Sequence, residues 1–282
     1  MAGGRERFIA QKSAGEPITM LTCYDYPTAV MQDEAGLDII FVGDSVGTNV
    51  LGYGSETEVT MEDMLHHLRA VRRGVKDAYL LVDMPHRSFR TPEIALKNAR
   101  ALIAAGAEGV KLEGGSEQRD VVRALAEDGI DVCGHIGFTP QTLSQPGGKG
   151  RVQGKSLESA RTLIESADVL ETAGIMLLVL ELVTEGVAEI ITRRLQVPTI
   201  GIGAGPACDG QVLVTTDLVG ISPFTRKIAR RYAEVREIET SAFRQYNGDV
   251  KAGRFPTGAN AFPTDPEDLV QLRELYGLPQ RV

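Results

Sequence analysis

Short apolar runs recur along the 282-residue chain and alternate with longer segments in which apolar residues return every three or four positions. Eight runs have the length and β-branched content of strands: 18–24, 39–44, 79–85, 109–115, 131–137, 175–182, 197–205 and 212–220. Helical periodicity covers 60–74, 91–107, 116–129, 156–174 and 184–195. Strands that are apolar on both faces and alternate with helices predict a parallel sheet covered on both sides. Eight such units predict an α/β protein, a (β/α)8 TIM barrel.

A doubly wound sheet is the alternative architecture. Its dinucleotide-binding form requires G-x-G-x-x-G after an early strand, whereas "GIGAGP" (201–206) follows the seventh run and has Pro206 in place of the third glycine. We interpret these glycines as close backbone packing at a barrel rim. Because composition does not shift along the chain, we expect one barrel domain over 1–282, with a long loop at 138–155 and a helical C-terminal extension from about residue 222.

Charge and cysteine content narrow the class of protein. A net charge of −8 and a pI near 5.2 argue against a nucleic-acid-binding surface. Neither a leader-like apolar segment at the N-terminus nor a run of about 20 apolar residues is present in the sequence. Cys23, Cys133 and Cys208 are isolated, which favours a reducing, cytoplasmic setting and argues against a structural zinc site.

Ionisable residues stand at the ends of five consecutive predicted strands. Asp44, Asp83, Glu113, His135 and Glu181 each lie where a run finishes. One such carboxylate can be explained as the cap of the next helix. In a (β/α)8 barrel, however, the C-terminal ends of all strands meet at one rim, where the active site is built. Five ionisable groups there predict a functional site.

Side-chain alternation places the same residues inside the barrel. Lys111 and Glu113 share one face of their strand while Leu112 points to the other, toward the outer helices. His135 shares its face with Cys133 in the same way. The polar set can therefore face the barrel mouth without breaking the apolar pattern.

Three of these carboxylates predict a metal site. Asp44, Asp83 and Glu113 lie on neighbouring strands about 4.8 Å apart, so their charges require neutralisation. All-oxygen ligands suit Mg²⁺ better than zinc. Such a cation can chelate an α-keto acid and stabilise the enolate formed when a neighbouring C–H is removed. Lys111 would then neutralise the substrate carboxylate or the oxyanion, and Glu181 is the best-placed base.

With these residues assembled, the chain resembles the ketopantoate hydroxymethyltransferase (3-methyl-2-oxobutanoate hydroxymethyltransferase) family from about residue 8 to residue 262. Several dispersed motifs in the family's order carry the resemblance: "TCYDY" (22–26), "VGDSVG" (42–47), "VTMEDMLHHLRAVRRG" (59–74), "LVDMP" (81–85), "VKLEGG" (110–115), "CGHIGFTPQ" (133–141), "VQGK" (152–155), "LVLE" (178–181) and "IGIGAGPACDGQVLV" (200–214).

The resemblance implies a (β/α)8 barrel of the phosphoenolpyruvate/pyruvate type and a particular set of ligands. It makes Asp44 and Asp83 direct Mg²⁺ ligands, with Glu113 close to the metal and binding it through water. Ser45 and Lys111 would contact 3-methyl-2-oxobutanoate (α-ketoisovalerate), beside the two aspartates.

The resemblance also implies the reaction. Glu181 would accept the proton from C3 of the keto acid. For His135 two interpretations stay open, a hydrogen-bonding residue of the wall or a contributor to substrate binding. The enolate would attack the methylene group of 5,10-methylenetetrahydrofolate and give 2-dehydropantoate and tetrahydrofolate, a step of pantothenate and coenzyme A biosynthesis. The family's homodecamers imply a large cytoplasmic homo-oligomer. Whether folate or a related carrier such as tetrahydromethanopterin is the donor stays open at this point.

Three positions differ from the family's pattern. His86 and Arg87 follow "DMP" where an aromatic and small residues are expected, and they add charge near the predicted metal. Leu182 stands where Cys is frequent, and "FPTGANAFP" (255–263) replaces a "P…EHSF"-like segment. The difference at 255–263 leaves the role of the C-terminal tail open.

Other polar residues have simpler explanations. We interpret His66 and His67 as packing or surface residues of their helix. Tyr24 faces the same mouth by position, and Asp25 either does so or caps the following helix.

The loop at 138–155 suggests a further hypothesis and leaves two alternatives. It would close over the site and place Lys149, Arg151 and Lys155 near the anionic tail of folate. The enzymatic alternative is a Mg²⁺-dependent lyase or mutase of the same superfamily, although Cys133 lacks the lysines of a reactive-cysteine loop. The other alternative is a non-catalytic barrel, which would have no need of the intact acidic rim.

Overall fold

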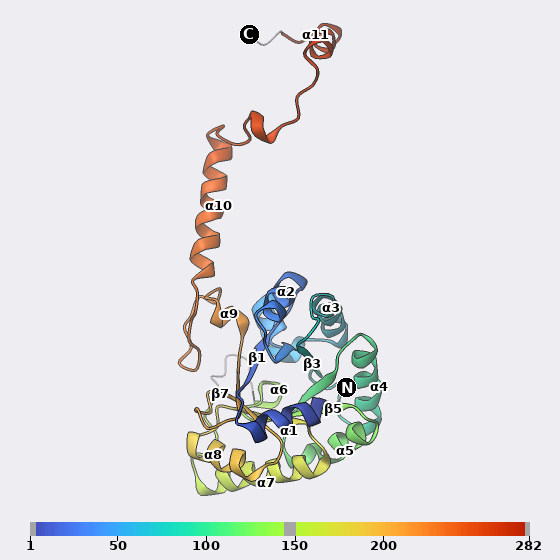
Figure 1. The fold of residues 1–282 in the computed structure, drawn as a ribbon, viewed down its shortest axis with the longest axis vertical. Coiled ribbons are helices and arrows are strands. Elements are labelled where there is room, and N and C mark those ends of the chain that lie inside the picture. Colours follow the sequence, from blue (N-terminus) through green and yellow to red (C-terminus); the bar gives the residue numbers. More distant parts are fainter. Residues whose placement is uncertain (1–3, 144–150, 280–282) are drawn as a thin grey trace. The chain divides into compact units, whose positions relative to one another are not determined.

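A computed structural model of the chain describes residues 4–143 and 151–279 and contains a closed barrel of eight parallel strands (Figure 1). The order of the strands around the barrel is their order in the chain, and β8 pairs with β1 to close it. This confirms the predicted architecture and excludes the doubly wound sheet. The strands are β1 Ile18–Thr22, β2 Ile39–Val42, β3 Tyr79–Asp83, β4 Gly109–Glu113, β5 Asp131–Gly137, β6 Leu177–Glu181, β7 Thr199–Ile202 and β8 Gly210–Leu213.

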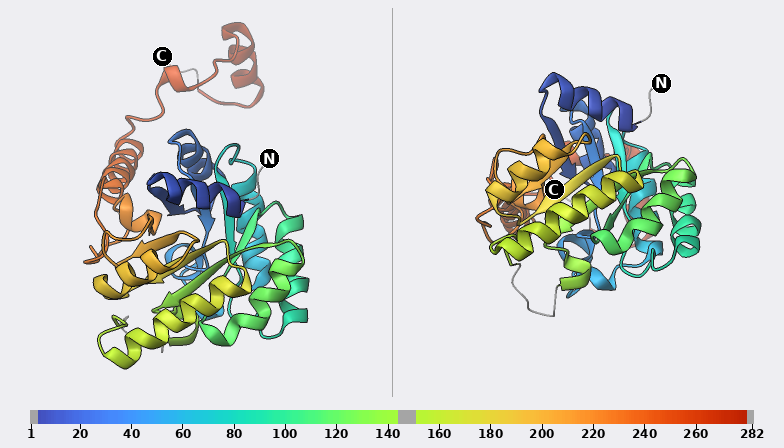
Figure 2. Two further views of the ribbon diagram at one scale, coloured as in Figure 1. Left: turned by 60° about the horizontal axis from the view of Figure 1, so that its bottom comes forward. Right: turned by 90° about the horizontal axis from the view of Figure 1, so that it is seen from below.

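Helices surround these strands in both views of Figure 2. Thr60 and Asp63 form a reciprocal capping box that fixes the predicted start of α3. Four helices of the barrel unit, α1, α2, α6 and α9, lie outside the segments with predicted helical periodicity. The barrel unit contains α1 Gly4–Ala14, α2 Tyr26–Glu34, α3 Met61–Arg72, α4 Pro92–Ala104, α5 Arg119–Glu127, α6 Pro140–Leu143, α7 Leu157–Ala173, α8 Glu185–Arg194, α9 Thr215–Leu218 and the short turns η1 Gly47–Leu51, η2 Glu56–Glu58 and η3 Ser116–Gln118.

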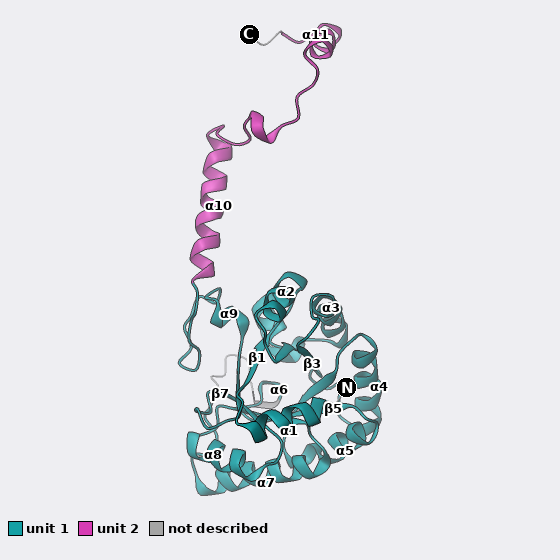
Figure 3. Ribbon diagram, in the orientation of Figure 1, with its two compact units in different colours: residues 1–233 teal, residues 234–282 magenta. Residues whose placement is uncertain are grey.

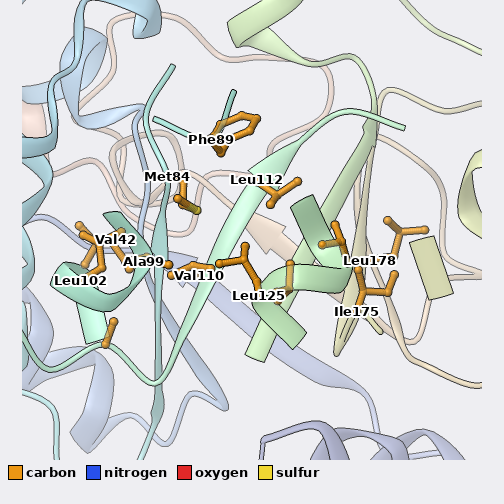
Figure 4. Close-up of a cluster of buried hydrophobic side chains, with 14 of the residues drawn as sticks. Val42, Met84, Phe89, Ala99, Leu102, Val110, Leu112, Leu125, Ile175 and Leu178 are labelled. Carbon is orange, nitrogen blue, oxygen red and sulfur yellow. The ribbon is translucent and has the colours of Figure 1, made fainter. Parts of the chain in front are cut away.

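The apolar residues form two separate cores. The larger core lies between the strands and the outer helices and contains Val42, Leu102, Val110, Leu112 and Leu178 among others (Figure 4). The smaller core fills the barrel interior with side chains from the opposite strand faces, including those of Ile39, Leu81, Cys133 and Val179. Leu112 therefore points outward as alternation predicted, while its neighbours Lys111 and Glu113 face the interior.

Helix α1 closes the barrel at the N-terminal ends of the strands. Phe8 is fully buried in the inner core and packs edge-on against Tyr79, with 5.3 Å between ring centroids. Gly4 donates its backbone N–H to Asp131 at the start of β5, and Lys12 reaches Asp209 just before β8. This segment was not predicted to be a helix, because its apolar side chains are few and show no strong helical stripe.

Two predicted elements were wrong in their extent. The run 212–220 holds only the end of β8, because Thr215 turns into α9 and donates to the carbonyl of Thr22 from its hydroxyl. The helical extension predicted from about residue 222 has its first helix only from Val235. Arg226 is held at Asp217, and the backbone of the intervening segment returns to α9, so tertiary contacts override its helical propensity.

The chain divides into two compact units, residues 1–233 and 234–282, coloured separately in Figure 3. The second unit contains α10 Val235–Lys251, η4 Gly258–Asn260 and α11 Pro266–Leu275. Neither α10 nor α11 contains a buried residue. No helix in the described ranges is both long and apolar enough to cross a membrane.

Candidate active site

The predicted site residues converge on one cavity at the C-terminal ends of the strands. It has a volume of about 390 Å³. Its lining includes the whole predicted set: Asp44, Ser45, Asp83, Lys111, Glu113, His135 and Glu181. Because β2 to β6 are consecutive around the barrel, their ends deliver these side chains to one half of the mouth. The predicted grouping is confirmed; the role of each residue stays a prediction.

A buried ion pair forms the floor of the cavity. Lys111 Nζ lies 2.7 Å from Asp83 Oδ1 and 5.3 Å from the centroid of the Phe41 ring. The backbone N–H of Asp44 donates to the other Asp83 oxygen at 3.0 Å, which orients that carboxylate. All three ionisable side chains are buried, so their charges interact in a medium of low dielectric.

Burial and the charges of neighbouring side chains shift the pKa values of the residues that form this floor. Burial, followed by the charges of Asp83 and Glu113, holds the pKa of Asp44 well above its usual range. Burial also raises the pKa of Asp83, despite the nearby Lys111. Burial alone would lower the pKa of Lys111, but the surrounding carboxylates outweigh it and raise that pKa. The floor therefore has more negative groups than its single lysine neutralises.

A histidine joins the floor to the open side of the cavity. His135 Nδ1 lies 3.4 Å from Glu113 Oε1, and His135 Nε2 lies 3.3 Å from Glu181 Oε2. Burial and the nearby Lys111 oppose protonation of the ring, yet the two neighbouring glutamates outweigh them and raise the pKa of His135. Glu181 is the accessible member, with its side chain 20% exposed. The ring thus lies between a buried glutamate and one that faces the cavity.

The turn after β2 presents Ser45. Its hydroxyl lies 2.9 Å from the hydroxyl of buried Tyr24, whose carbonyl contacts His67 Nδ1 at 2.6 Å. His67 therefore contacts the backbone of Tyr24 and lies outside the described lining of the cavity. Asp25 caps α2 by accepting the N–H of Thr28, which settles the alternative in favour of a helix cap.

Gln141 is a site residue that the sequence reasoning missed. Its side-chain amide donates to Asp44 at 2.7 Å and to the carbonyl of Met84 at 3.0 Å, while its backbone N–H donates to Glu113 at 2.9 Å. It lies in α6, within a segment expected to be loop. Its presence in the motif "CGHIGFTPQ" was a signal, but nothing in the spacing indicated its contacts.

The oxygen-rich floor fits a divalent cation. Among the described residues, no three His, Cys, Asp or Glu side chains form a ready-made ligand cage. Mg²⁺ does not need one, because one or two carboxylates hold it while water and substrate oxygens complete its shell. Asp44 and Asp83 can serve as those carboxylates. The buried Oε1 of Gln141, which has no hydrogen-bond partner in the described part of the chain, offers an acceptor for such a water.

Several other sequence predictions lie away from this cavity. His86 and Arg87 are outside its described lining, and Arg87 Nε donates to the His86 ring instead. Lys149 lies outside the described residues, so the predicted loop closure stays untested. Gly203 supports close packing at the rim, because a Cβ there would lie 2.6 Å from Ile228.

A reactive cysteine is absent from the candidate chemistry. All three cysteines are free thiols. Cys133 is fully buried in the inner core, and burial raises its pKa, so the thiolate is disfavoured. The lyase alternative that depends on such a cysteine loses its support here.

A wider groove of about 740 Å³, lined by Lys12 and Asp209, contains none of the predicted site residues.

Solved structures resemble the barrel at low sequence identity. A phosphonopyruvate hydrolase in complex with oxalate and Mg²⁺ is 13% identical with a TM-score of 0.61, covering 98% of this chain and 95% of its own. A 2,3-dimethylmalate lyase, a member of the PEP mutase/isocitrate lyase superfamily, is 14% identical with a TM-score of 0.58, covering 98% and 96%. These neighbours confirm the predicted type of barrel.

Relatives in sequence are much closer. The 3-methyl-2-oxobutanoate hydroxymethyltransferase of Acetivibrio thermocellus is 48% identical over 261 residues, 92% of each chain. That of Thermosipho melanesiensis is 47% identical over 259 residues, 91% of this chain and 97% of its own. The model of the ketopantoate hydroxymethyltransferase family matches residues 5–258. The chain therefore belongs to the ketopantoate hydroxymethyltransferase family and is an enzyme of that hydroxymethyltransferase class.

Proposed function

We propose that this enzyme removes the C3 proton of 3-methyl-2-oxobutanoate with Glu181 and transfers a hydroxymethyl group from 5,10-methylenetetrahydrofolate to the resulting enolate. The products are 2-dehydropantoate, a precursor of pantothenate and coenzyme A, and tetrahydrofolate. The observation that supports this proposal is the placement of Glu181, an accessible carboxylate 3.3 Å from His135, above a buried floor of carboxylates and one lysine.

The floor is suited to hold the keto acid. Asp44 and Asp83 would hold Mg²⁺ directly, with Glu113 near it through water. When bound, this cation withdraws electron density from the keto oxygen and lowers the cost of the enolate. The Lys111 ammonium, held at Asp83, balances the added negative charge of the substrate, and Ser45 donates a hydrogen bond toward it.

Glu181 performs the proton transfer in this proposal. A general base must lie within hydrogen-bond reach of the proton that it takes, and Glu181 is on the cavity wall at the end of β6. His135 lies 3.3 Å from this carboxylate on one side and 3.4 Å from Glu113 on the other. Once protonated, Glu181 can return this proton to one of the two folate nitrogens released from the methylene carbon. A water molecule supplies the hydroxyl group that this carbon carries in the product and gives its other proton to the second nitrogen, so atoms and charge balance over the cycle.

Proton NMR tests the first half of the reaction without the folate. The purified enzyme is mixed with 3-methyl-2-oxobutanoate in D₂O, with Mg²⁺ or with EDTA, and loss of the C3–H signal is followed. We expect metal-dependent exchange in the wild-type enzyme and a loss of about 10²- to 10⁴-fold in Glu181→Gln, the usual contribution of a general base.

A matched variant separates this effect from the loss of any nearby glutamate. Glu185→Gln changes an exposed glutamate of α8 outside the described cavity lining and is expected to exchange normally. If the wild-type enzyme shows no exchange, the measurement is repeated with tetrahydrofolate present. Silence in both conditions would contradict the proposal.

The proposal also covers assembly and location. Following the family resemblance, we propose a homo-oligomer, a homodecamer in the family, that acts in the cytoplasm on small molecules. Light scattering of the purified full chain tests the assembly, and a monomer would contradict it.

A further inference from the structure

The cavity continues beyond the floor that is suited to the keto acid. The wall opposite β4 is built by the end of β8 and by α9, since strands four and eight are farthest apart in a closed ring of eight. Asp217 from α9 and Arg226 line this wall, together with Thr48 and Asn49 of η1 and Glu56 of η2. These residues were not among the predicted site residues, and the proposed proton transfer does not use them.

Asp217 is a buried carboxylate facing this part of the cavity. Its side chain is 8% exposed, whereas that of its ion-pair partner Arg226 is 66% exposed. Arg226 Nε approaches Asp217 Oδ2 at 3.2 Å. Burying a charged carboxylate is costly unless its oxygens are paired. Among the described residues, the partner of this carboxylate is one mostly exposed side chain, which is weak compensation, so a ligand with well-placed donors would be strongly favoured here.

The position of Asp217 is fixed relative to the keto acid end of the cavity. The neighbouring Thr216 donates from its hydroxyl to Asn49 Oδ1 at 2.8 Å. The Asn49 side chain in turn donates to the carbonyl of Ser45 at 2.9 Å. This relay ties α9 to the turn that presents Ser45, and η1 is a π-helical turn, a local geometry that is frequent at functional sites.

Apolar side chains line the same cavity. They belong to Phe138, Ile202, Val214 and Ile228. Ligand sites of this kind combine apolar walls with a few polar groups that fix orientation. A planar heterocycle between these walls would present its edge to Asp217.

We propose that Asp217 recognises the pterin ring of the folate donor by accepting hydrogen bonds from its N3–H and 2-amino group. The inference rests on the proposed function, because it assigns a place to the donor of that reaction. The two oxygens of a carboxylate match two adjacent N–H donors, as they match the fork of a guanidinium. Arg226 is a positioning residue that pairs with the carboxylate and orients it. Arginine has only donors, so it cannot accept from this edge of the ring.

Binding of tetrahydrofolate and of its 2-deamino analogue, measured by titration calorimetry, tests the assignment. We expect the wild-type enzyme to bind tetrahydrofolate about 10- to 100-fold more tightly, because hydrogen bonds to charged groups have this strength. In Asp217→Asn, where one acceptor oxygen becomes a donor, tetrahydrofolate should bind about 10- to 100-fold more weakly while the analogue changes little. The preference for the 2-amino group would then disappear.

Two control variants distinguish recognition from a structural role. Arg226→Gln breaks the same ion pair but keeps the carboxylate, so it should retain most of the preference for the 2-amino group. Glu56→Gln removes the other carboxylate of the wall and should retain the preference fully. Loss of the preference for the 2-amino group in Glu56→Gln, with the preference retained in Asp217→Asn, would overturn the assignment.

Wild-type measurements keep the inference testable even if Asp217→Asn does not fold. Equal wild-type affinity for tetrahydrofolate and the 2-deamino analogue would overturn it directly. C3–H exchange of the keto acid in the wild-type enzyme tests the proposed function separately. Exchange without a 2-amino preference removes only the role of Asp217, whereas absence of exchange both with and without tetrahydrofolate removes the proposed function on which that role rests.

Discussion

Carboxylates at the two ends of the barrel lie in contrasting surroundings, and their pKa values shift in opposite directions. At the N-terminal end, Asp38 accepts hydrogen bonds from the Thr19 backbone N–H and hydroxyl and from Gln11, all at 2.8–2.9 Å. Burial would raise its pKa, but these donors outweigh it and lower the pKa. At the C-terminal end, Asp44 is buried beside other carboxylates, and its pKa is raised.

This difference separates stability from function within one fold. The N-terminal end is the closed end, because α1 covers it, and the C-terminal end is the open one. Carboxylates at the closed end satisfy backbone donors and hold α1 in place. Asp131, for example, accepts hydrogen bonds from the Gly4 backbone N–H and the Tyr79 hydroxyl at 3.1 Å each. Carboxylates at the open end repel one another and are thereby prepared for a cation and a substrate. Barrels of this kind place catalysis at the C-terminal face and stability at the other. Substitutions at the two ends should therefore have opposite consequences.

The largest expected effect is on activity at the open end. Asp44→Asn keeps the shape of the side chain and one oxygen for Gln141 but removes a charge that the proposed Mg²⁺ site requires. We expect the transferase rate to fall by about three orders of magnitude, roughly 4 kcal/mol of transition-state stabilisation. In EDTA, the variant should melt at the same or a higher temperature than the wild-type enzyme, because repulsion within the floor is relieved.

Calorimetric melting with and without Mg²⁺ provides the check independent of activity. The wild-type enzyme should gain stability from Mg²⁺ by mass action, and the variant should gain much less. Asp38→Asn, at the closed end, should respond to Mg²⁺ like the wild type. A full Mg²⁺ response in Asp44→Asn would show that the cation binds elsewhere.

The next largest effect is on stability at the closed end. Phe8→Ala removes a fully buried ring from the inner core and leaves a cavity beside Tyr79. We expect the free energy of unfolding to fall by about 3–5 kcal/mol, the usual cost of such a truncation. The rate per folded molecule should stay within about two-fold, because α1 does not reach the open end. Denaturant titration and activity at low temperature measure the two quantities.

A contrary result would show that the two ends of the barrel are not independent in function. If Phe8→Ala lowered the rate per folded molecule as strongly as Asp44→Asn, the closed end would take part in shaping the cavity. Phe255→Ala offers a comparison in the second unit, where the aromatic side chain is 40% exposed and less stability should be lost.

The sequence predicted the open end better than the closed end, for a physical reason. Alternation along a strand fixes the side of each residue, so Lys111, Glu113 and His135 could be placed in the mouth from their positions alone. The family resemblance then supplied roles that spacing does not contain. Helix α1 was missed because Phe8 and Ile9 are its only large apolar residues and form no helical stripe, and the importance of Phe8 comes entirely from the barrel that α1 closes.

Long-range contacts explain the other misses. Gln141 contacts residues from two distant strands, and Asp217 pairs with Arg226 across an irregular segment. No periodicity signals such contacts, because they depend on how loops meet above the barrel. The β-branched run around Thr215 favoured a strand, yet its hydroxyl bonds to β1 and the chain turns there.

The smallest expected effect is the pH dependence of stability at the closed end. Because the pKa of Asp38 is lower in the folded than in the unfolded chain, its contribution is fully present above its unfolded pKa of about 4 and is lost as pH falls through the folded value. Asp38→Asn should therefore lower the free energy of unfolding by about 1–2 kcal/mol at neutral pH. The difference in the free energy of unfolding between Asp38→Asn and the wild type should narrow steadily in acid.

The pH dependence that Asp44 contributes has the opposite sign, since its raised pKa favours the folded state in acid and this contribution is lost as pH rises. Urea titrations of the metal-free wild type and both variants from neutral pH into acid would resolve the two slopes, and parallel curves for the two variants would contradict the distinction between the ends.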